Sequence, residues 1–204
     1  IREGRVDEAV DLALTYTPFP ATVCGYLCPN LCMQGCSRQW AGMTPVDVSS
    51  LGKASIEATL PELPPLSGHR IAVIGGGPAG MSVAWQLRQH GHEAILYDLE
   101  KKLGGKISSL VPRTRIPDEI IDAELERVRE ALPHIHLQQK LEIEEVEQLK
   151  EDYDFVIIAV GAQKPRILPV PGKERMIPAL QFLKDSKAAK AQVGKTVVVI
   201  GAGN

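Results

Sequence analysis

A glycine-rich run at residues 75–80 is the part of the sequence whose residue types and spacing most directly indicate a chemistry. It is a G-x-G-x-x-G pattern that follows the apolar residues 71–74. In dinucleotide-binding folds, Gly75 would permit a tight turn, Gly77 would let a pyrophosphate approach the backbone, and Gly80 would let a helix pack closely on the strand. The run therefore predicts a dinucleotide site. The alternative is a strand–helix turn that binds nothing.

The residues after this run extend the fingerprint. Pro78 and Ala79 would open a helix whose free N–H groups face the phosphates. Asp98 ends the next expected strand about 20 residues on, where such folds carry an acid that binds ribose hydroxyls. Leu103-Gly-Gly105 and a later strand ending in Val160-Gly161 lie outside the minimal NAD fingerprint. Together they favour FAD, although Gly104-Gly105 alone would be read as an ordinary turn.

Near the end of the sequence, an apolar strand pattern followed by a glycine turn occurs a second time. Residues 196–200 are apolar and read as a buried parallel strand, and Gly201 and Gly203 would begin another Rossmann unit. Such a strand needs a following helix to cover it, and the chain starts at Ile1 without an initiator Met. We therefore expect the sequence to be a fragment of a longer protein.

All four cysteines form one regular C-x3-C-x3-C-x3-C array: Cys24, Cys28, Cys32 and Cys36. Four buried apolar thiols at one spacing would be unusual, and two disulfides fit poorly with a cytosolic nucleotide-binding protein. The array alone leaves zinc and iron–sulfur ligation open, and the flavin motif beside it favours iron–sulfur. In one continuous helix the first and last thiols would be roughly 18 Å apart, too far for one cubane. Either Gly25, Pro29 and Gly35 break the helix around one cluster, or the array serves two clusters.

Composition limits the classes of protein to which the sequence can belong. The hydrophobic content of 44% can fill a core, and the net charge of −2 gives no reason to expect a nucleic-acid or anionic-membrane partner. The longest apolar runs, such as 155–160, are far shorter than the roughly 20 residues that cross a bilayer. No secretory signal is visible at the start. We therefore expect a cytoplasmic protein.

Alternating strands and helices predict an α/β fold with a doubly wound, parallel, Rossmann-like sheet. A proline-rich stretch at 60–68 indicates a linker. We expect a helical cysteine-rich domain of the iron–sulfur type over 1–66, part of an FAD-binding domain over 67–193, and the start of an NADPH-binding domain over 194–204. The expected strands are 71–74, 94–98, 134–137, 155–160 and 196–200, and the expected helices are 5–16, 47–58, 79–91, 117–132, 144–151 and 178–189.

No residue pattern indicates a catalytic acid, base or nucleophile. His134 and His136 alternate on an expected strand and are interpreted as surface residues, and Glu142–Glu147 is interpreted as a solvated helix face. A flavin disulfide reductase would need a C-x-x-C or C-x4-C pair near the flavin. No cysteine follows Cys36, so this class of enzyme is disfavoured.

The order of the motifs resembles one known family, that of glutamate synthase small (beta) subunits and the N-terminal half of dihydropyrimidine dehydrogenase. The resemblance covers nearly the whole sequence, and residues 24–34 make it strongest to the YgfK-type selenate reductase subunits. The matching motifs are Pro18-Phe-Pro20, Cys28-Pro29 with Cys32 and Cys36, Pro45-Val-Asp-Val48, the glycine run, Leu103-Gly-Gly105, Arg115-Ile-Pro117 and Ala159-Val-Gly-Ala162.

This resemblance implies an NADPH-dependent FAD and iron–sulfur oxidoreductase, in which a helical domain with two [4Fe–4S] clusters precedes an FAD domain interrupted by an NADPH domain. NADPH would pass a hydride to the flavin, and electrons would continue to the clusters and to a partner domain or subunit with the terminal reaction. The alternative from another class is a non-catalytic nucleotide-binding module with a structural zinc site. The implied cofactor contacts are Gly75, Gly77, Pro78, Ala79, Gly80 and Asp98 for the AMP and pyrophosphate part of FAD, Gly105, Lys106 and Ile107 towards the flavin, Val160 and Gly161 beside them, and Gly201 and Gly203 for NADPH.

Two departures from the family concern the cysteines. The family's other cluster ligands come from cysteines that would precede Ile1, so this sequence alone would hold incomplete clusters. Glutamate synthase subunits usually carry a non-cysteine residue at the position of Cys24. A glutamine that completes one cluster in dihydropyrimidine dehydrogenase has no good counterpart around Gly52. We hypothesise that Cys24 fills that role.

Overall fold

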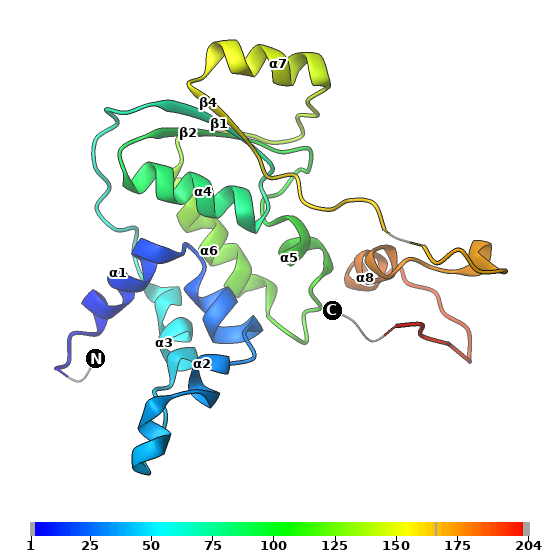
Figure 1. Ribbon diagram of the computed structural model, residues 1–204, viewed down its shortest axis with the longest axis horizontal. Helices are drawn as coiled ribbons and strands as arrows, with labels where there is room; N and C mark the ends of the chain where they lie inside the picture. The colour runs from blue at the N-terminus through cyan, green and yellow to red at the C-terminus, as the bar shows by residue number, and fades with distance from the viewer. Residues whose placement is uncertain (1–2, 166, 202–204) are drawn as a thin grey trace.

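A four-stranded parallel sheet forms the centre of the computed structural model, which describes residues 3–165 and 167–201. The strands lie in the order β3-β2-β1-β4 and pair in parallel throughout. Helices α4 and α6 cover one face of the sheet, and α7 covers the other (Figure 1). The predicted α/β fold with a doubly wound, Rossmann-like sheet is confirmed. The element bounds are β1 (Arg70–Ile74), α4 (Pro78–Gln89), β2 (Glu93–Tyr97), α6 (Asp118–Ala131), β3 (His134–His136), α7 (Ile143–Asp152) and β4 (Phe155–Ile158).

Alternate side chains of the central strand β1 enter two separate hydrophobic clusters. Ile71 and Val73 pack on the side of α4 and α6, whereas Ala72 and Ile74 pack with Leu149 of α7. Successive side chains of a strand point to opposite faces, and here both faces are covered. This is why the sequence of β1 is a continuous apolar run rather than an alternating one.

The helices around the sheet begin at residues that favour a helix N-terminus. Pro78 stands in the first turn of α4, where a missing N–H is harmless. Glu142 and Glu145 form a capping box at the start of α7.

Two further helices are α5 (Gly105–Leu110) and α8 (Ala179–Lys187). Of the helices in the described part of the chain, none is long and apolar enough to cross a bilayer.

Helix α5 was not expected from the sequence. The pair Gly104-Gly105 looks like a glycine turn in the sequence. Both residues do have a positive φ, at +106° for Gly104, the N-cap, and +51° for Gly105, the first residue of the helix. Its six residues are also too few to show a helical period.

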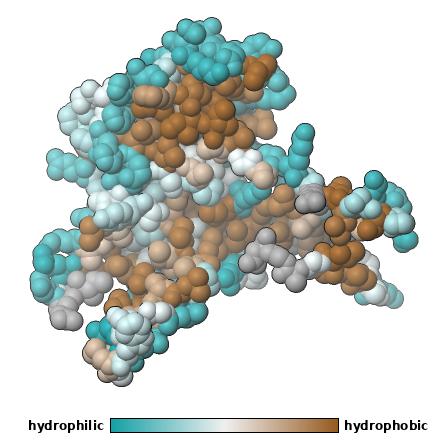
Figure 2. Space-filling view, in the orientation of Figure 1, coloured by the Kyte–Doolittle hydropathy of each residue, from teal (hydrophilic) through white to brown (hydrophobic). Residues whose placement is uncertain are grey.

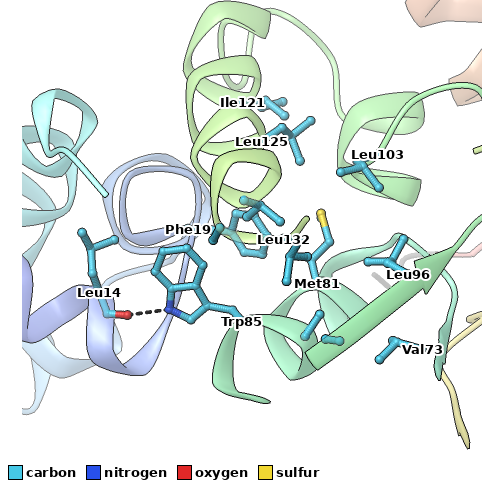
Figure 3. Close-up of a cluster of buried hydrophobic side chains, with 14 of the residues drawn as sticks. Leu14, Phe19, Val73, Met81, Trp85, Leu96, Leu103, Ile121, Leu125 and Leu132 are labelled. Atoms are coloured by element: carbon cyan, nitrogen blue, oxygen red, sulfur yellow. Dashed lines mark hydrogen bonds between the residues drawn. The ribbon is translucent and has the colours of Figure 1, made fainter. Parts of the chain in front are cut away.

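The N-terminal third of the chain is helical and packs against the same core as the sheet. Trp85 of α4 is fully buried, and its Nε1 donates a hydrogen bond to the Leu14 carbonyl at 2.7 Å (Figure 3). Phe19 joins the same cluster as Met81. The first helices and the sheet therefore share one hydrophobic core, while the division of the chain at 66 and 193 stays a prediction. The elements of this part are α1 (Val6–Tyr16), the π-helix η1 (Ala21–Leu27), α2 (Leu31–Gln34), the 3-10 helix η2 (Ser37–Ala41), α3 (Val48–Ala54) and the 3-10 helix η3 (Ser55–Glu57).

Two expectations about strands are wrong. Residues 196–200 form no strand in the described chain, because no neighbouring strand lies beside them to pair with, and Val198 and Val199 are 80% and 82% exposed. β4 was expected to be a buried strand over 155–160, but it ends at Ile158 and pairs only with β1. It therefore lies at the edge of the sheet, where Phe155 and Ile158 are exposed. Hydrophobic side chains gather over this edge in Figure 2.

Candidate functional site

The glycine turn after β1 brings together the carboxyl ends of three strands. The Gly75 N–H donates to the Tyr97 carbonyl of β2 at 2.8 Å. Gly75 has a φ of +115°, and a Cβ on it would lie 2.4 Å from the Ala159 carbonyl oxygen after β4. A Cβ on Gly80 would lie 1.8 Å from the Gly75 carbonyl oxygen. The tight turn and the close helix approach that the motif predicts are therefore present.

Gly77 differs from these two glycines because the space beside it is open. It is the N-cap of α4, and the only neighbour within 4 Å of an added Cβ would be the Gly105 Cα, at 4.0 Å. The first N–H groups of a helix have no partner within the helix. The start of α4 consequently offers backbone donors and a partial positive charge at a place that no side chain fills. This geometry suits an anionic group such as a pyrophosphate.

The turn at residues 103–105 packs directly on the glycine turn. The Gly104 N–H donates to the Gly76 carbonyl at 2.8 Å, and a Cβ on Gly105 would lie only 2.9 Å from the Gly77 Cα. Leu103 is fully buried and belongs to the main hydrophobic cluster (Figure 3). Gly104-Gly105 is thus part of the same site as the first motif.

Asp98 lies directly after β2, beside this pair of turns. One carboxylate oxygen accepts the Gly76 N–H, and the other accepts the Glu100 N–H at 2.6 Å. Each carboxylate oxygen can accept a second hydrogen bond. The acid that the motif predicts is therefore held next to the glycine turn, with acceptor capacity left for hydroxyl groups.

The remaining residues predicted to contact the cofactor lie in α5 and in the segment after β4. Lys106 of α5 donates from Nζ to the Ala162 carbonyl, which links α5 to the segment after β4. Ile107 packs against the main core, and Gly161 has a φ of +68°. An open pocket of about 310 Å³ lies next to them between α5 and α8, with Lys106, Ser109, Gln163, Gln181 and Lys184 among its lining residues.

Three other sets of residues are positioned as follows. Gly201 lies in open space with a φ of +108°, and Gly203 is outside the described residues. His134 and His136 are exposed, as predicted, and His134 Nε2 lies 3.1 Å from the Glu93 carboxylate. The glutamates of 142–147 are exposed on α7.

The cysteine array does not form one continuous helix. Cys24 lies within η1, which ends before Cys28, and Pro29 and Asn30 separate η1 from α2. Asn30 has a left-handed φ of +57°, so the chain turns sharply there. A break at Pro29, which the sequence left as one of two alternatives, is present. Gly25, by contrast, lies inside η1 and does not interrupt it.

The four thiols are free, and their surroundings differ. Cys28 Sγ accepts the Asn30 N–H at 3.4 Å. Hydrogen bonds from the backbone of Val46 and Arg38 lower the pKa of the Cys36 thiol below its usual value. The pKa of the Cys24 thiol is raised, mainly by burial and then by the charges of Cys28 and Cys32. Thiol ligands, with N–H···S hydrogen bonds at Cys28 and Cys36, suit metal-binding thiolates.

Their arrangement, however, does not complete a metal site. Across residues 3–165 and 167–201, no group of three His, Cys, Asp or Glu side chains is placed so that it could hold a metal ion. A structural zinc would need four ligands, with Zn–S distances of about 2.3 Å. A cubane would likewise need its thiolates in one place. These residues in this arrangement therefore do not fit a whole cluster or a zinc ion by themselves.

One buried acid of this region was missed in the sequence. Glu124 of α6 is fully buried and accepts hydrogen bonds from the Ala21 and Thr22 N–H groups in η1. The signal was present in the sequence, because Glu124 lies three residues after Ile121 and four before Val128, on the apolar face of an amphipathic helix.

Comparisons with known proteins agree with this geometry. YgfK of Escherichia coli O157:H7, which is named as an oxidoreductase, is 31% identical over 99% of the chain. The NADPH glutamate synthase small chain of Mycobacterium tuberculosis and the NADP⁺-dependent formate dehydrogenase subunit beta of Moorella thermoacetica are each 28% identical over 100% of the chain. The chain spans 20%, 46% and 34% of the lengths of these three proteins, in that order. The predicted resemblance to YgfK and to glutamate synthase small subunits is confirmed.

A family assignment follows from the part of the chain that contains the sheet. The pattern that defines the pyridine nucleotide-disulphide oxidoreductases matches residues 69–204, which is more than half of the sequence. The match includes the glycine turn, Asp98 and the Gly104-Gly105 turn described above. The chain belongs to the pyridine nucleotide-disulphide oxidoreductase family.

Proposed function

We propose that the protein is an NADPH-dependent FAD and iron–sulfur oxidoreductase that serves as the electron-input subunit or domain of a larger enzyme. The observation that carries this proposal is the meeting of three glycine-containing segments at one end of the sheet. Gly75–Gly80 lies there against the backbone of both Leu103–Gly105 and Ala159–Gly161. A site built from backbone and lined by so few side chains suits a long, phosphate-bearing cofactor.

In this proposal FAD lies along the three segments and, when bound, supplies the exchange between hydride and single-electron chemistry. Gly77 and the N–H groups of Ala79 and Gly80 would bind the pyrophosphate. Asp98 would accept hydrogen bonds from the ribose hydroxyls. Lys106, fixed to the Ala162 carbonyl, would hold a positive charge towards the flavin end. Gly105, Ile107, Val160 and Gly161 would complete the walls.

NADPH is proposed as the electron donor. The family match extends through Gly201 and Gly203, which would begin its binding site. One relative is named for NADPH and another for NADP⁺, which supports this choice of donor. The proposed organisation keeps the divisions 1–66, 67–193 and 194–204 for the iron–sulfur, FAD and NADPH parts.

The four cysteines are proposed as iron–sulfur ligands that contribute to two clusters rather than one. The support is that the thiols are spread over separate short helices, with Cys24 in η1, Cys32 in α2 and Cys36 just before η2. No three of these thiols come together in the described chain, so each cluster would need ligands in addition to them.

Cys24 is proposed as the unusual ligand of the array. Replacing it, Cys24→Ser in the whole protein, is expected to reduce bound iron and to change the electron paramagnetic resonance spectrum of the reduced protein. Val23→Ala, at an exposed neighbour on η1, serves as the control. Unchanged iron content and an unchanged spectrum in the Cys24 variant would contradict this role.

A partner subunit or domain is proposed to carry the terminal reaction. Two of the relatives are named as a chain or subunit of an enzyme, which supports an assembly of this kind.

The decisive experiment is the absorption spectrum of the whole protein, purified without oxygen, before and after NADPH is added. We expect an absorption band near 450 nm with a broad shoulder, and bleaching of the band by NADPH. A colourless protein that contains zinc would overturn the proposal and favour a non-catalytic nucleotide-binding module. A yellow protein without iron would retain the flavin part and overturn the iron–sulfur part.

A further inference from the structure

Helix α6 carries a buried pair of opposite charges that faces away from solvent. The side chains of Glu124 and Arg127 are 0% and 4% exposed, and Arg127 Nη1 lies 3.9 Å from Glu124 Oε1. Burying charged groups is costly unless they are paired and hydrogen-bonded. Their position therefore calls for a structural reason beyond the α/β fold itself.

Glu124 holds the beginning of η1. Its Oε1 accepts the Ala21 N–H at 2.7 Å, and its Oε2 accepts the Thr22 N–H at 2.8 Å. These two donors lie in the first turn of a helix, where backbone N–H groups have no partner within the helix. A carboxylate is a strong acceptor for such donors. The η1 segment that starts here contains Cys24.

Arg127 holds a second segment of the N-terminal part. Its Nη2 donates to the Ser55 carbonyl at 2.7 Å and to the Ala58 carbonyl at 3.2 Å. Ser55 begins η3, which follows α3 directly, and Ala58 is the first residue after η3. One turn of α6 thus holds the start of η1 through an acid, and both ends of η3, the segment after α3, through a base. We call these two residues and their four backbone contacts the α6 clamp.

Between these two contacts, η1 and α3 cross with almost no space. A Cβ on Gly52 would lie 2.6 Å from the Gly25 nitrogen, 2.7 Å from the Pro20 carbonyl oxygen and 3.1 Å from the Cys24 carbonyl carbon. The backbone at Cys24 is therefore confined by α3 on one side, while Glu124 fixes the turn that precedes it. Its position cannot shift without opening the clamp or the crossing.

The same turn of α6 also contacts the dinucleotide site. Leu125, the residue after Glu124, is buried, and its Cδ1 would lie 3.4 Å from a Cβ on Gly104. Leu125 and Ile121 lie close to Leu103 in the core (Figure 3). Lys102, just before this turn, pairs with Asp122 of α6 at 2.5 Å. Adjacent residues of α6 thus reach the Cys24 segment and the Leu103–Gly105 turn.

We propose that Glu124 is a positioning residue that fixes the Cys24 segment relative to the dinucleotide turn through α6. The inference deepens the proposed function and rests on it for the identity of the two cofactors. The part of the inference that concerns positioning alone does not depend on the cofactors. The clamp, the glycine crossing and the Leu125 contact join the two segments whether or not a metal is bound.

The test compares three variants of the whole protein, purified anaerobically with its cofactors. Glu124→Gln keeps the shape but cannot accept both N–H groups and leaves Arg127 without its counter-charge. Glu124→Asp keeps the charge with a shorter reach. Glu126→Gln is the matched control, because Glu126 forms an exposed i,i+3 pair with Arg129 on the same helix. The readouts are iron per FAD, the rate at which a chelator removes iron, the spectrum of the reduced clusters, and amide hydrogen exchange of residues 21–27.

With Glu124→Gln we expect chelator to remove iron about tenfold faster and the amides of 21–27 to exchange about tenfold faster, since unsatisfied buried donors weaken this segment. FAD content and exchange in β1 should match the wild type, and the reduced-cluster spectrum should change. Glu124→Asp should recover part of the iron retention, and Glu126→Gln should behave as wild type. If Glu124→Gln retains iron and protects 21–27 like the wild type, or loses FAD and iron together, the inference is overturned.

Failure of the proposed function would look different. If the wild type carries no iron, the cluster proposal fails. The positioning inference is then decided by hydrogen exchange alone, with faster exchange at 21–27 in Glu124→Gln but not Glu126→Gln supporting it, and equal exchange overturning it.

Discussion

At the scale of single residues, the glycines of the turn after β1 belong to one sequence motif but have different physical roles. Gly80 and Gly75 are glycine because backbone atoms lie where a Cβ would stand, at 1.8 Å and 2.4 Å. A Cβ on Gly77 would have its nearest neighbour at 4.0 Å, and the φ of Gly77 is −79°. The protein's own packing therefore does not explain Gly77, whereas space for a ligand does.

This difference predicts opposite effects of two alanine substitutions. Gly77→Ala should lower FAD affinity at least about tenfold, which is about 1.4 kcal/mol, and leave the stability of the FAD-free protein nearly unchanged. Gly80→Ala should destabilise the FAD-free protein by about 1–3 kcal/mol through overpacking. Flavin absorbance after gel filtration and urea unfolding measure the two effects. Equal destabilisation by both substitutions would contradict the assignment of Gly77 to ligand binding.

Asp47 provides a prediction about pH. It caps α3, and hydrogen bonds from Ser49 and Ser50 lower its pKa from 3.8 to about 2. Because the folded-state pKa is below the unfolded value, the cap stabilises fully above about pH 4. This contribution is lost as the pH falls towards about 2. Nuclear magnetic resonance titration of the Asp47 carboxyl should show a midpoint near 2, and Ser49→Ala with Ser50→Ala should return it towards 3.8. An unchanged midpoint in that double variant would show that the two serines do not cause the low pKa.

At the scale of elements, η1 and α3 cross at Gly25, inside the π-helix that residues 21–27 form. The two backbones approach so closely that an added Cβ would lie 2.6 Å from its nearest backbone atom at Gly52 and 3.0 Å at Gly25. π-helical turns are rare and often lie at functional sites. Here the π-helix contains Cys24 and ends just before Cys28, so its geometry sets where two of the four thiols emerge.

Replacing a glycine of this crossing by alanine should therefore lower the stability of the protein, whereas the same change in most helices raises it. In an unhindered helix, replacing glycine by alanine stabilises by about 1 kcal/mol. Gly52→Ala should instead destabilise by about 1–3 kcal/mol, because its Cβ would meet the Gly25 nitrogen and the Pro20 oxygen. Gly35→Ala is the control, since its Cβ would meet only the Leu31 oxygen at 3.6 Å. Urea unfolding followed by circular dichroism measures both, and a stabilising Gly52→Ala would contradict the crossing.

At the scale of the whole molecule, the cysteine-bearing part and the sheet are joined by a common core and by α6. Leu14 and Phe19 pack in the same cluster as Val73 and Leu96. Trp85 closes the contact through its hydrogen bond to Leu14. Groups bound in the two parts would thus be held at a fixed separation, which suits electron transfer better than two loosely linked domains would.

The shared core predicts one cooperative unfolding transition. Trp85 and Trp40 are the two tryptophans of the sequence, and Trp40 is 89% exposed. In Trp40→Phe, the fluorescence of Trp85 should change at the same urea concentration as the circular dichroism signal. Trp85→Phe should lose about 1–3 kcal/mol of stability, whereas Trp40→Phe should change it by less than about 0.5 kcal/mol. Separate fluorescence and circular dichroism transitions would show that the two parts unfold independently.

The sequence by itself determined the central fold and the nucleotide turn. Local physics suffices there: an apolar run, three glycines at fixed spacing and an acid about 20 residues on specify a strand, a tight turn and a second strand. The helices that follow could be recognised for the same reason, because their caps and apolar periods lie within one segment. Pro29 likewise ended a helix through its own geometry.

Only the tertiary structure decided which distant segments meet. It showed that Gly105 faces Gly77, that β4 is an edge strand and that residues 196–200 have no strand to pair with in the described chain. It also showed that Glu124 reaches η1, about a hundred residues earlier in the chain. The place of Glu124 on the apolar face of α6 indicates that it is buried but not which groups it binds. The partners of a strand or of a buried charge are atoms that are remote in sequence, and a local pattern does not identify them.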